Sequence, residues 1–153
     1  MKQCKVCPYK EVVNDQKWFC PFFKCSYEKL EGKKDKALAV LNKCDEEFPA
    51  SILPHDYWHS QSHHIGQAYL QLGETEKAMD ILSQVADYEI EYIIWYLSLD
   101  EKNFAISFGE VRGCLSTLVK ILQIMERSTD KATLNHYAEI FDSLYRELES
   151  RVK

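Results

Sequence analysis

Four cysteines near the start of the chain have the residue type and spacing most suggestive of chemistry. Two residues separate Cys4 from Cys7, and four separate Cys20 from Cys25. Four thiolates this close together suit tetrahedral coordination of Zn²⁺. Such a site would be structural, because all four coordination positions would be filled by the protein. Two alternative roles of these cysteines remain open. They could be small apolar side chains in the core, or they could form disulfides if the chain is exported. Beyond one structural zinc, no cofactor is expected.

A histidine cluster is the second candidate for metal binding. His59 and His63 are four residues apart and would share one face of a helix, the geometry of a two-histidine metal pair. No glutamate follows His59 in the H-E-x-x-H pattern, however. We therefore favour the interpretation that these histidines are polar residues at the start of an exposed helix, with Asp56 as its N-cap.

No catalytic constellation is found in the sequence. It lacks a G-x-S-x-G motif, a P-loop and a glycine-rich phosphate-binding turn. Cys114 lies among apolar neighbours, and no charged residue is placed to lower the pKa of its thiol. The sequence therefore predicts a protein that is not an enzyme.

Composition and charge exclude several other classes. The chain has 153 residues, enough for one domain with a sizeable core, and its net charge is -5. An acidic chain without a basic cluster is not expected to bind nucleic acid. No apolar run reaches the ~20 residues of a membrane span, so direct membrane insertion is not expected. The first ten residues lack a signal-peptide core, which favours the cytoplasm.

The elements that must position these residues are helices, and two pairs of them repeat. Within 62–85, apolar positions at helical spacing predict two helices separated by a break at Gly73. The same spacing predicts further helices over 21–31, 33–47, 87–99, 104–127 and 131–152. The stretches around residues 30–44 and 71–85 align at a constant offset. The aligned pairs are Gly32 with Gly73, Ala37 with Ala78, Leu41 with Leu82, and Cys44 with Val85.

This repeat resembles the tetratricopeptide repeat. Gly66, Tyr69, Gly73, Ala78 and Leu82 fall at the signature spacings of that family, whereas the first unit departs from them at Cys25 and Glu28. The resemblance implies a concave face that contacts ligands and is formed by the first helix of each pair. In the second unit its positions hold Ser60, His63, Gln67, Leu70 and Gln71, and in the first unit Phe19, Phe22, Ser26, Lys29 and Leu30.

The groove implied by the resemblance differs from that of the carboxylate-binding repeats. Those members carry Lys and Asn at the two central positions, where this chain has His63 and Gln67. The difference argues against capture of a C-terminal carboxylate and favours an apolar helix or extended segment. The alternative is that the long C-terminal helices fill the groove.

A wider resemblance runs from Tyr27 to Leu148. The chain contains, in this order, the stretches GKKDKAL, AYLQLGETEKA and EYIIWYLSL, then a long helix and a final amphipathic helix. This order resembles that of the soluble C-terminal segment of certain multi-pass membrane proteins of Bacteroidetes. Those membrane proteins are related to protein O-mannosyltransferases. The resemblance implies an accessory segment of a bacterial glycosyl-transfer system on the extracytoplasmic side. It implies no catalytic residue in this chain.

Together these observations predict an all-α fold, a short tetratricopeptide-like solenoid of antiparallel helix pairs capped by long C-terminal helices. We expect a single domain over 1–153, with a cysteine-rich segment over 1–20, two repeats over 21–86 and capping helices over 87–153. The predicted function is binding of a protein or peptide partner. A zinc-stapled or redox-linked module is the alternative. The aromatic residues of 87–99 also suggest a homodimer interface.

Overall fold

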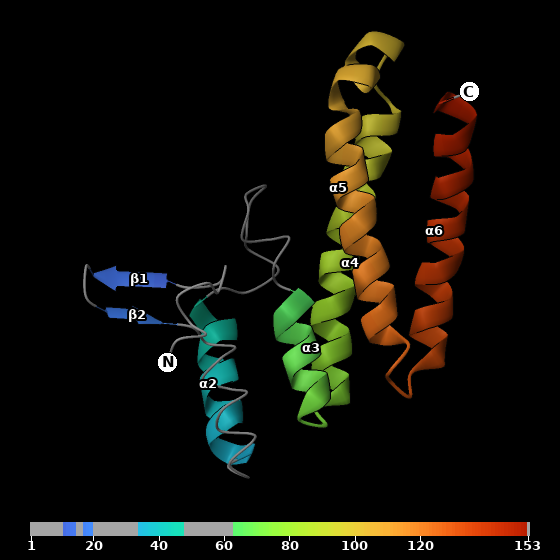
Figure 1. The fold of residues 1–153 in the computed structure, drawn as a ribbon. Helices are drawn as coiled ribbons and strands as arrows, with labels where there is room; N and C mark the ends of the chain where they lie inside the picture. Colours follow the sequence, from blue (N-terminus) through green and yellow to red (C-terminus); the bar gives the residue numbers. More distant parts are fainter. Residues whose placement is uncertain (1–10, 15–16, 20–33, 48–62, 153) are drawn as a thin grey trace. The chain divides into compact units, whose positions relative to one another are not determined.

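α-Helices make up most of the computed structural model, which describes residues 11–14, 17–19, 34–47 and 63–152 (Figure 1). This agrees with the predicted all-α class. The chain divides into two compact units, Met1–Ala78 and Met79–Lys153, which are described in turn. Within the described ranges, no helix is both long enough and apolar enough to cross a membrane.

A short antiparallel hairpin precedes the helices. Strand β1 (Glu11–Asn14) pairs with β2 (Lys17–Phe19), Glu11 opposite Phe19 and Val12 opposite Trp18, with an irregularity before Asn14. Phe19, which the repeat resemblance placed on a helix, belongs to a strand instead. The β-branched pair Val12-Val13 favours an extended backbone, which explains the difference.

Helix α2 (Lys34–Glu47) has the bounds expected for the second helix of the first repeat. Ala37 and Leu41 are fully buried, as their spacing of four residues predicts for one helix face. The helix ends directly before Phe48-Pro49, because proline disfavours helical backbone at the residue before it.

Helix α3 (His63–Gln71) ends in a tight turn before α4 (Thr75–Leu97). Gly73 has φ of 83°, a left-handed conformation that glycine adopts more readily than any other residue. The Glu74 N–H donates to the Tyr69 carbonyl across the turn, at 3.0 Å, which satisfies one of the last carbonyls of α3. The predicted helical break is therefore confirmed.

Helix α4 is one continuous helix of 23 residues, whereas the sequence predicted two helices over this range. Ile90, Ile93 and Tyr96 continue the buried stripe without a break. Ile94 and Trp95 are 53% and 55% exposed, so the apolar residues of this stretch are only partly covered. The sequence contains no proline or glycine that would interrupt it.

Helix α5 (Glu101–Met125) starts three residues earlier than predicted and is unbroken at Gly109. Asp100 is its N-cap and accepts a hydrogen bond from the Asn103 N–H at 3.0 Å, so 101–103 form the first helical turn. A Cβ atom built on Gly109 or Gly113 would meet no atom within 4 Å. Among the described residues, these glycines therefore serve no close approach of a neighbouring backbone.

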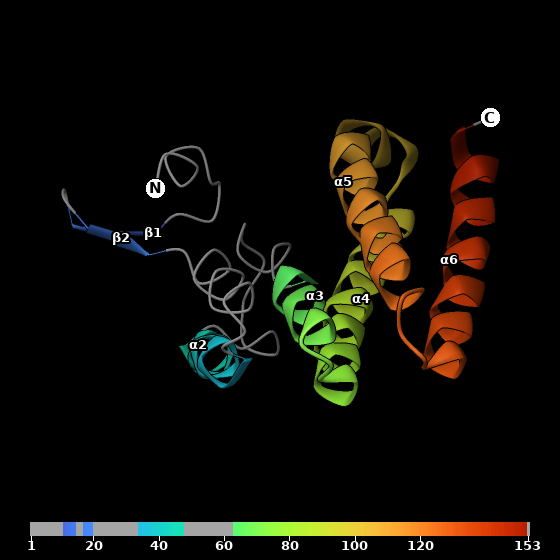
Figure 2. The ribbon, with the colours of Figure 1, turned by 60° about the horizontal axis from the view of Figure 1, so that its bottom comes forward.

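Helix α6 (Lys131–Val152) has the predicted bounds, and a tight turn joins it to α5 (Figure 2). The Asp130 carboxylate accepts from the Thr133 N–H at 3.1 Å, which confirms the predicted helix start. Tyr137, Leu144 and Leu148 are buried, and their spacings of seven and four residues place them on one helix face. Tyr145, in contrast, is 47% exposed and does not belong to the core.

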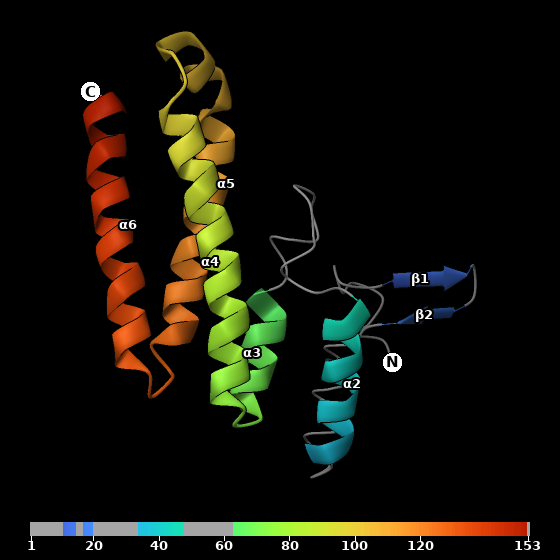
Figure 3. The same ribbon diagram turned by 180° about the vertical axis from the view of Figure 1, so that it is seen from behind.

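Within the second unit α6 runs parallel to α4, and α5 runs antiparallel to both (Figure 3). Two contacts fix this register. The Tyr137 hydroxyl lies 3.3 Å from the Ser83 carbonyl, and the Arg151 guanidinium donates to the Leu97 carbonyl, each pair separated by 54 residues. A constant offset over four turns of helix requires parallel axes.

Candidate functional site

Four of the predicted partner-binding positions of the second unit, His63, Gln67, Leu70 and Gln71, lie on helix α3. Gln67 and Leu70 are half-buried and Gln71 is exposed, so all three can reach a ligand. His63 is only 3% exposed, and its ring lies 4.0 Å from that of His64. Ser60 lies outside the described residues. Among the groove positions that the structure describes, the accessible ones are therefore Gln67, Leu70 and Gln71.

A polar cluster fixes α3 against α2 inside the first unit. The Tyr69 hydroxyl donates to Asn42 Oδ1 at 2.7 Å, and Lys77 Nζ donates to the same oxygen at 2.9 Å. Lys77 also lies 3.5 Å from Asp45 and over the Tyr69 ring, 4.7 Å from its centroid. Tyr69 is fully buried on the helix face opposite Gln67 and Gln71, so this cluster holds the accessible residues in place.

Of the candidate metal ligands, only His63 of the histidine pair lies in a part of the chain that the structure describes. Cys4, Cys7, Cys20 and Cys25 all lie outside the described residues, as do His55 and His59. Among the residues described, no three His, Cys, Asp or Glu side chains gather as a metal ion requires. The zinc site therefore remains a prediction.

A buried carboxyl group and a thiol meet between α4 and α5. Glu89 is only 4% exposed and forms a side-chain hydrogen bond with Cys114. Burial raises the pKa of Glu89 to about 7, although the hydrogen bond with Cys114 acts in the opposite direction. Burial and the nearby Glu89 and Glu110 carboxylates raise the pKa of the Cys114 thiol. Cys114 therefore stays a protonated thiol, as expected of an unreactive cysteine.

Glu89 was not identified from the sequence, although a signal was present. It occupies the same helical stripe as Leu82, Val85, Ile93 and Tyr96, which are all buried. A carboxylate at an apolar position of an amphipathic helix is a recognisable exception to the pattern. Periodicity analysis applied to the charged residues would have found it.

Comparison with known proteins supports the repeat architecture. The sequence model of the tetratricopeptide repeat matches residues 25–51 and 63–88. The first match contains α2, and the second contains α3 with the first half of α4. No curated protein and no solved structure matches the chain. The chain thus contains two tetratricopeptide-like units followed by two long helices.

Proposed function

We propose that this protein is a non-enzymatic interaction domain that binds a protein or peptide partner along α3. The observation that carries the proposal is the pair of tetratricopeptide matches at residues 25–51 and 63–88. Helical repeats of this kind present extended surfaces to partners and generally act in protein–protein interaction. The accessible Gln67, Leu70 and Gln71 supply the surface.

The chemistry of these side chains indicates the class of partner. Two amides and one leucine carry no formal charge and offer both hydrogen-bond donors and acceptors. Such a surface suits an apolar helix or an extended segment whose backbone pairs with the amides. It is poorly suited to a free carboxylate, because none of these three side chains carries a positive charge.

Site-specific photo-crosslinking followed by titration tests the proposal. A photoreactive amino acid at position 71 should capture a partner that the same group at Gln123, an exposed glutamine of α5, does not capture. The purified partner should then bind the double variant Gln67→Lys, Gln71→Lys at least tenfold more weakly, while Gln123→Lys binds like the wild type. Equal capture at both positions, or unchanged binding by a folded double variant, would overturn the proposal.

Two finer hypotheses remain from the sequence. An accessory role in a membrane glycosyl-transfer system rests on the order of segments from Tyr27 to Leu148, and co-purification with a membrane glycosyltransferase would test it. A structural zinc rests on the spacing of Cys4, Cys7, Cys20 and Cys25. Native mass spectrometry of the wild type and of Cys4→Ser, Cys7→Ser tests it, since a site of this kind would lose its metal in the variant.

A further inference from the structure

The contact between α4 and α5 encloses an acid that has one weak hydrogen-bond partner. Glu89 of α4 is 4% exposed and bonds to the side chain of Cys114, a half-buried thiol of α5. An ionised carboxylate can accept about four hydrogen bonds, whereas a thiol offers a single weak donor. The neutral carboxyl group of Glu89 therefore fits this contact, and the ionised group would be left largely unsatisfied in it.

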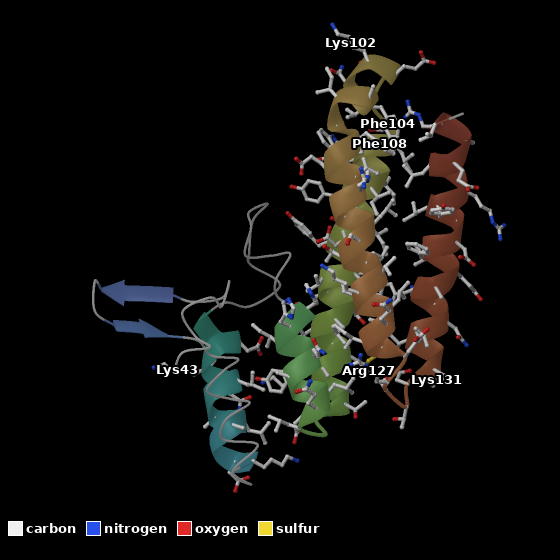
Figure 4. All side chains as sticks on the ribbon, in the orientation of Figure 1. Lys43, Lys102, Phe104, Phe108, Arg127 and Lys131 are labelled. Carbon is white, nitrogen blue, oxygen red and sulfur yellow. The ribbon has the colours of Figure 1, made fainter. Side chains whose placement is uncertain are left out.

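The cations of α5 lie away from this contact. Lys102 lies at one end of the helix and Arg127 just beyond the other, whereas Cys114 is in its middle (Figure 4). Arg112 and Lys120 are exposed and lie two and six residues from Cys114. At 3.6 residues per turn, these spacings turn their side chains about 160° and about 120° away from the thiol. No α5 cation is therefore placed to neutralise the buried acid.

The charged neighbour on α5 is itself acidic. Glu110 is exposed one turn before Cys114, and Tyr96 lies on α4 seven residues after Glu89. Burial, followed by the neighbouring Cys114 and Glu110, raises the pKa of the Tyr96 hydroxyl, so these groups lie close together. A negative neighbour favours the uncharged form of an acid. The cluster therefore favours neutral side chains.

Helix α6 supplies no compensating charge either. The offset of 54 residues between α4 and α6 places Ser143 level with Glu89. The charged α6 residues within about one turn of Ser143 are all exposed, and three of the four are acidic: Glu139, Asp142, Arg146 and Glu147. Among the residues that the structure describes, no ion pair involves Glu89.

We propose that the contact between Glu89 and Cys114 is a pH-sensitive switch in the second unit. The contact stays closed while Glu89 is neutral, and α4 and α5 separate locally at this level when Glu89 ionises. A buried carboxylate that lacks a cation reaches water only if the packing around it opens. Opening also exposes Cys114 to solvent. The switch does not depend on the α3 residues of the proposed function.

The reactivity of Cys114 reports whether the contact is open. In the closed contact, burial and the nearby Glu89 and Glu110 raise the pKa of the thiol, so it stays protonated and reacts slowly. In the open contact the thiol is hydrated and regains the reactivity of an exposed cysteine. The rate at which a reagent modifies Cys114 is therefore proportional to the fraction of open molecules.

The size of the effect follows from the two states of Glu89. The pKa of Glu89 is about 7 in the closed contact and returns to 4.5 when the carboxyl group is hydrated. Because the hydrated group ionises at lower pH, a rise in pH favours the open contact. Between pH 5 and pH 8 the ratio of open to closed molecules should rise about seventyfold.

Thiol modification of the full chain tests the proposal. A dipyridyl disulfide, which reacts with thiols even at acidic pH, is added, and the modified peptide that contains Cys114 is quantified by mass spectrometry. Glu89→Gln is neutral at every pH, so its rate corrects for the intrinsic pH dependence of the thiol. The ratio of the wild-type rate to the Glu89→Gln rate should rise about seventyfold from pH 5 to pH 8.

Two controls separate the switch from other causes. Glu91→Gln, at an exposed position of α4, should react like the wild type at each pH. Local opening exposes little surface, so about 1 M urea should accelerate the wild-type reaction at pH 8 by less than about threefold, whereas global unfolding would accelerate it more than tenfold.

Amide hydrogen exchange of residues 111–117 gives a second readout in the wild type if Glu89→Gln folds poorly. Corrected for intrinsic exchange, protection should fall by about the same seventyfold factor between pH 5 and pH 8. A rate ratio that does not change with pH, protection that does not change with pH, or acceleration by urea of more than tenfold would overturn the proposal.

Discussion

Glu89 makes the stability of the protein depend on pH in a direction opposite to that of most carboxyl groups. Its pKa is raised from 4.5 to about 7 by burial, so in the folded chain it carries a proton that the unfolded chain has released above pH 4.5. The contribution of Glu89 to stability is therefore greatest below pH 4.5, falls as pH rises from 4.5 to about 7, and changes little above that. A tenfold change in a protonation constant is worth about 1.4 kcal/mol, so the loss attributable to Glu89 is about 3 kcal/mol.

Glu89→Gln should remove this dependence, because glutamine has nearly the same shape and stays neutral. Urea denaturation should find the variant about 3 kcal/mol more stable than the wild type at pH 8 and nearly equal to it at pH 4.5. Glu91→Gln, an exposed position on the same helix, is the control and should change stability by less than about 0.5 kcal/mol at either pH. A Glu89→Gln difference that is the same at both pH values would refute this reasoning about buried charge.

Three further predictions concern backbone and hydrogen bonds. Gly73→Ala should lower the unfolding free energy by about 1 kcal/mol because φ is 83° there, and an unchanged urea midpoint would contradict this. Gly109→Ala and Gly113→Ala should each raise it by about 1 kcal/mol, since a Cβ meets nothing within 4 Å, and a lower melting temperature would disprove the open surface. Tyr137→Phe should lose the 2.8 Å hydrogen bond to Asp87 and about 1–2 kcal/mol, whereas full stability in calorimetry would show that bond to be unimportant.

Helix positions and their buried faces could be predicted from the sequence, because they depend on local signals. Gly73 marked the end of α3, Pro49 followed the end of α2, and Asp130 marked the start of α6. Each of these acts through its own backbone or its nearest neighbours. The bounds of α2 and α6 were therefore predicted to within one residue.

Features that depend on tertiary packing could not be predicted in the same way. Tyr145 fits the apolar period of α6 but is 47% exposed, because period alone does not say how wide a stripe the neighbouring helices cover. The position of the Arg151 guanidinium is set by its hydrogen bonds to the carbonyls of Leu97 and Leu99, which lie more than 50 residues earlier in the chain. The α3 positions came from a family pattern, and only packing revealed that His63 among them is buried.

The proposed function of this protein rests on the binding of a partner by the residues of α3. The most direct measurement is the change in backbone amide chemical shifts of the isotope-labelled chain when the partner captured through position 71 is added. We predict that the largest changes fall at Gln67, Leu70 and Gln71, and that they disappear with Gln67→Lys, Gln71→Lys. Shifts confined to other helices, or unchanged α3 signals at saturating partner, would contradict the claim.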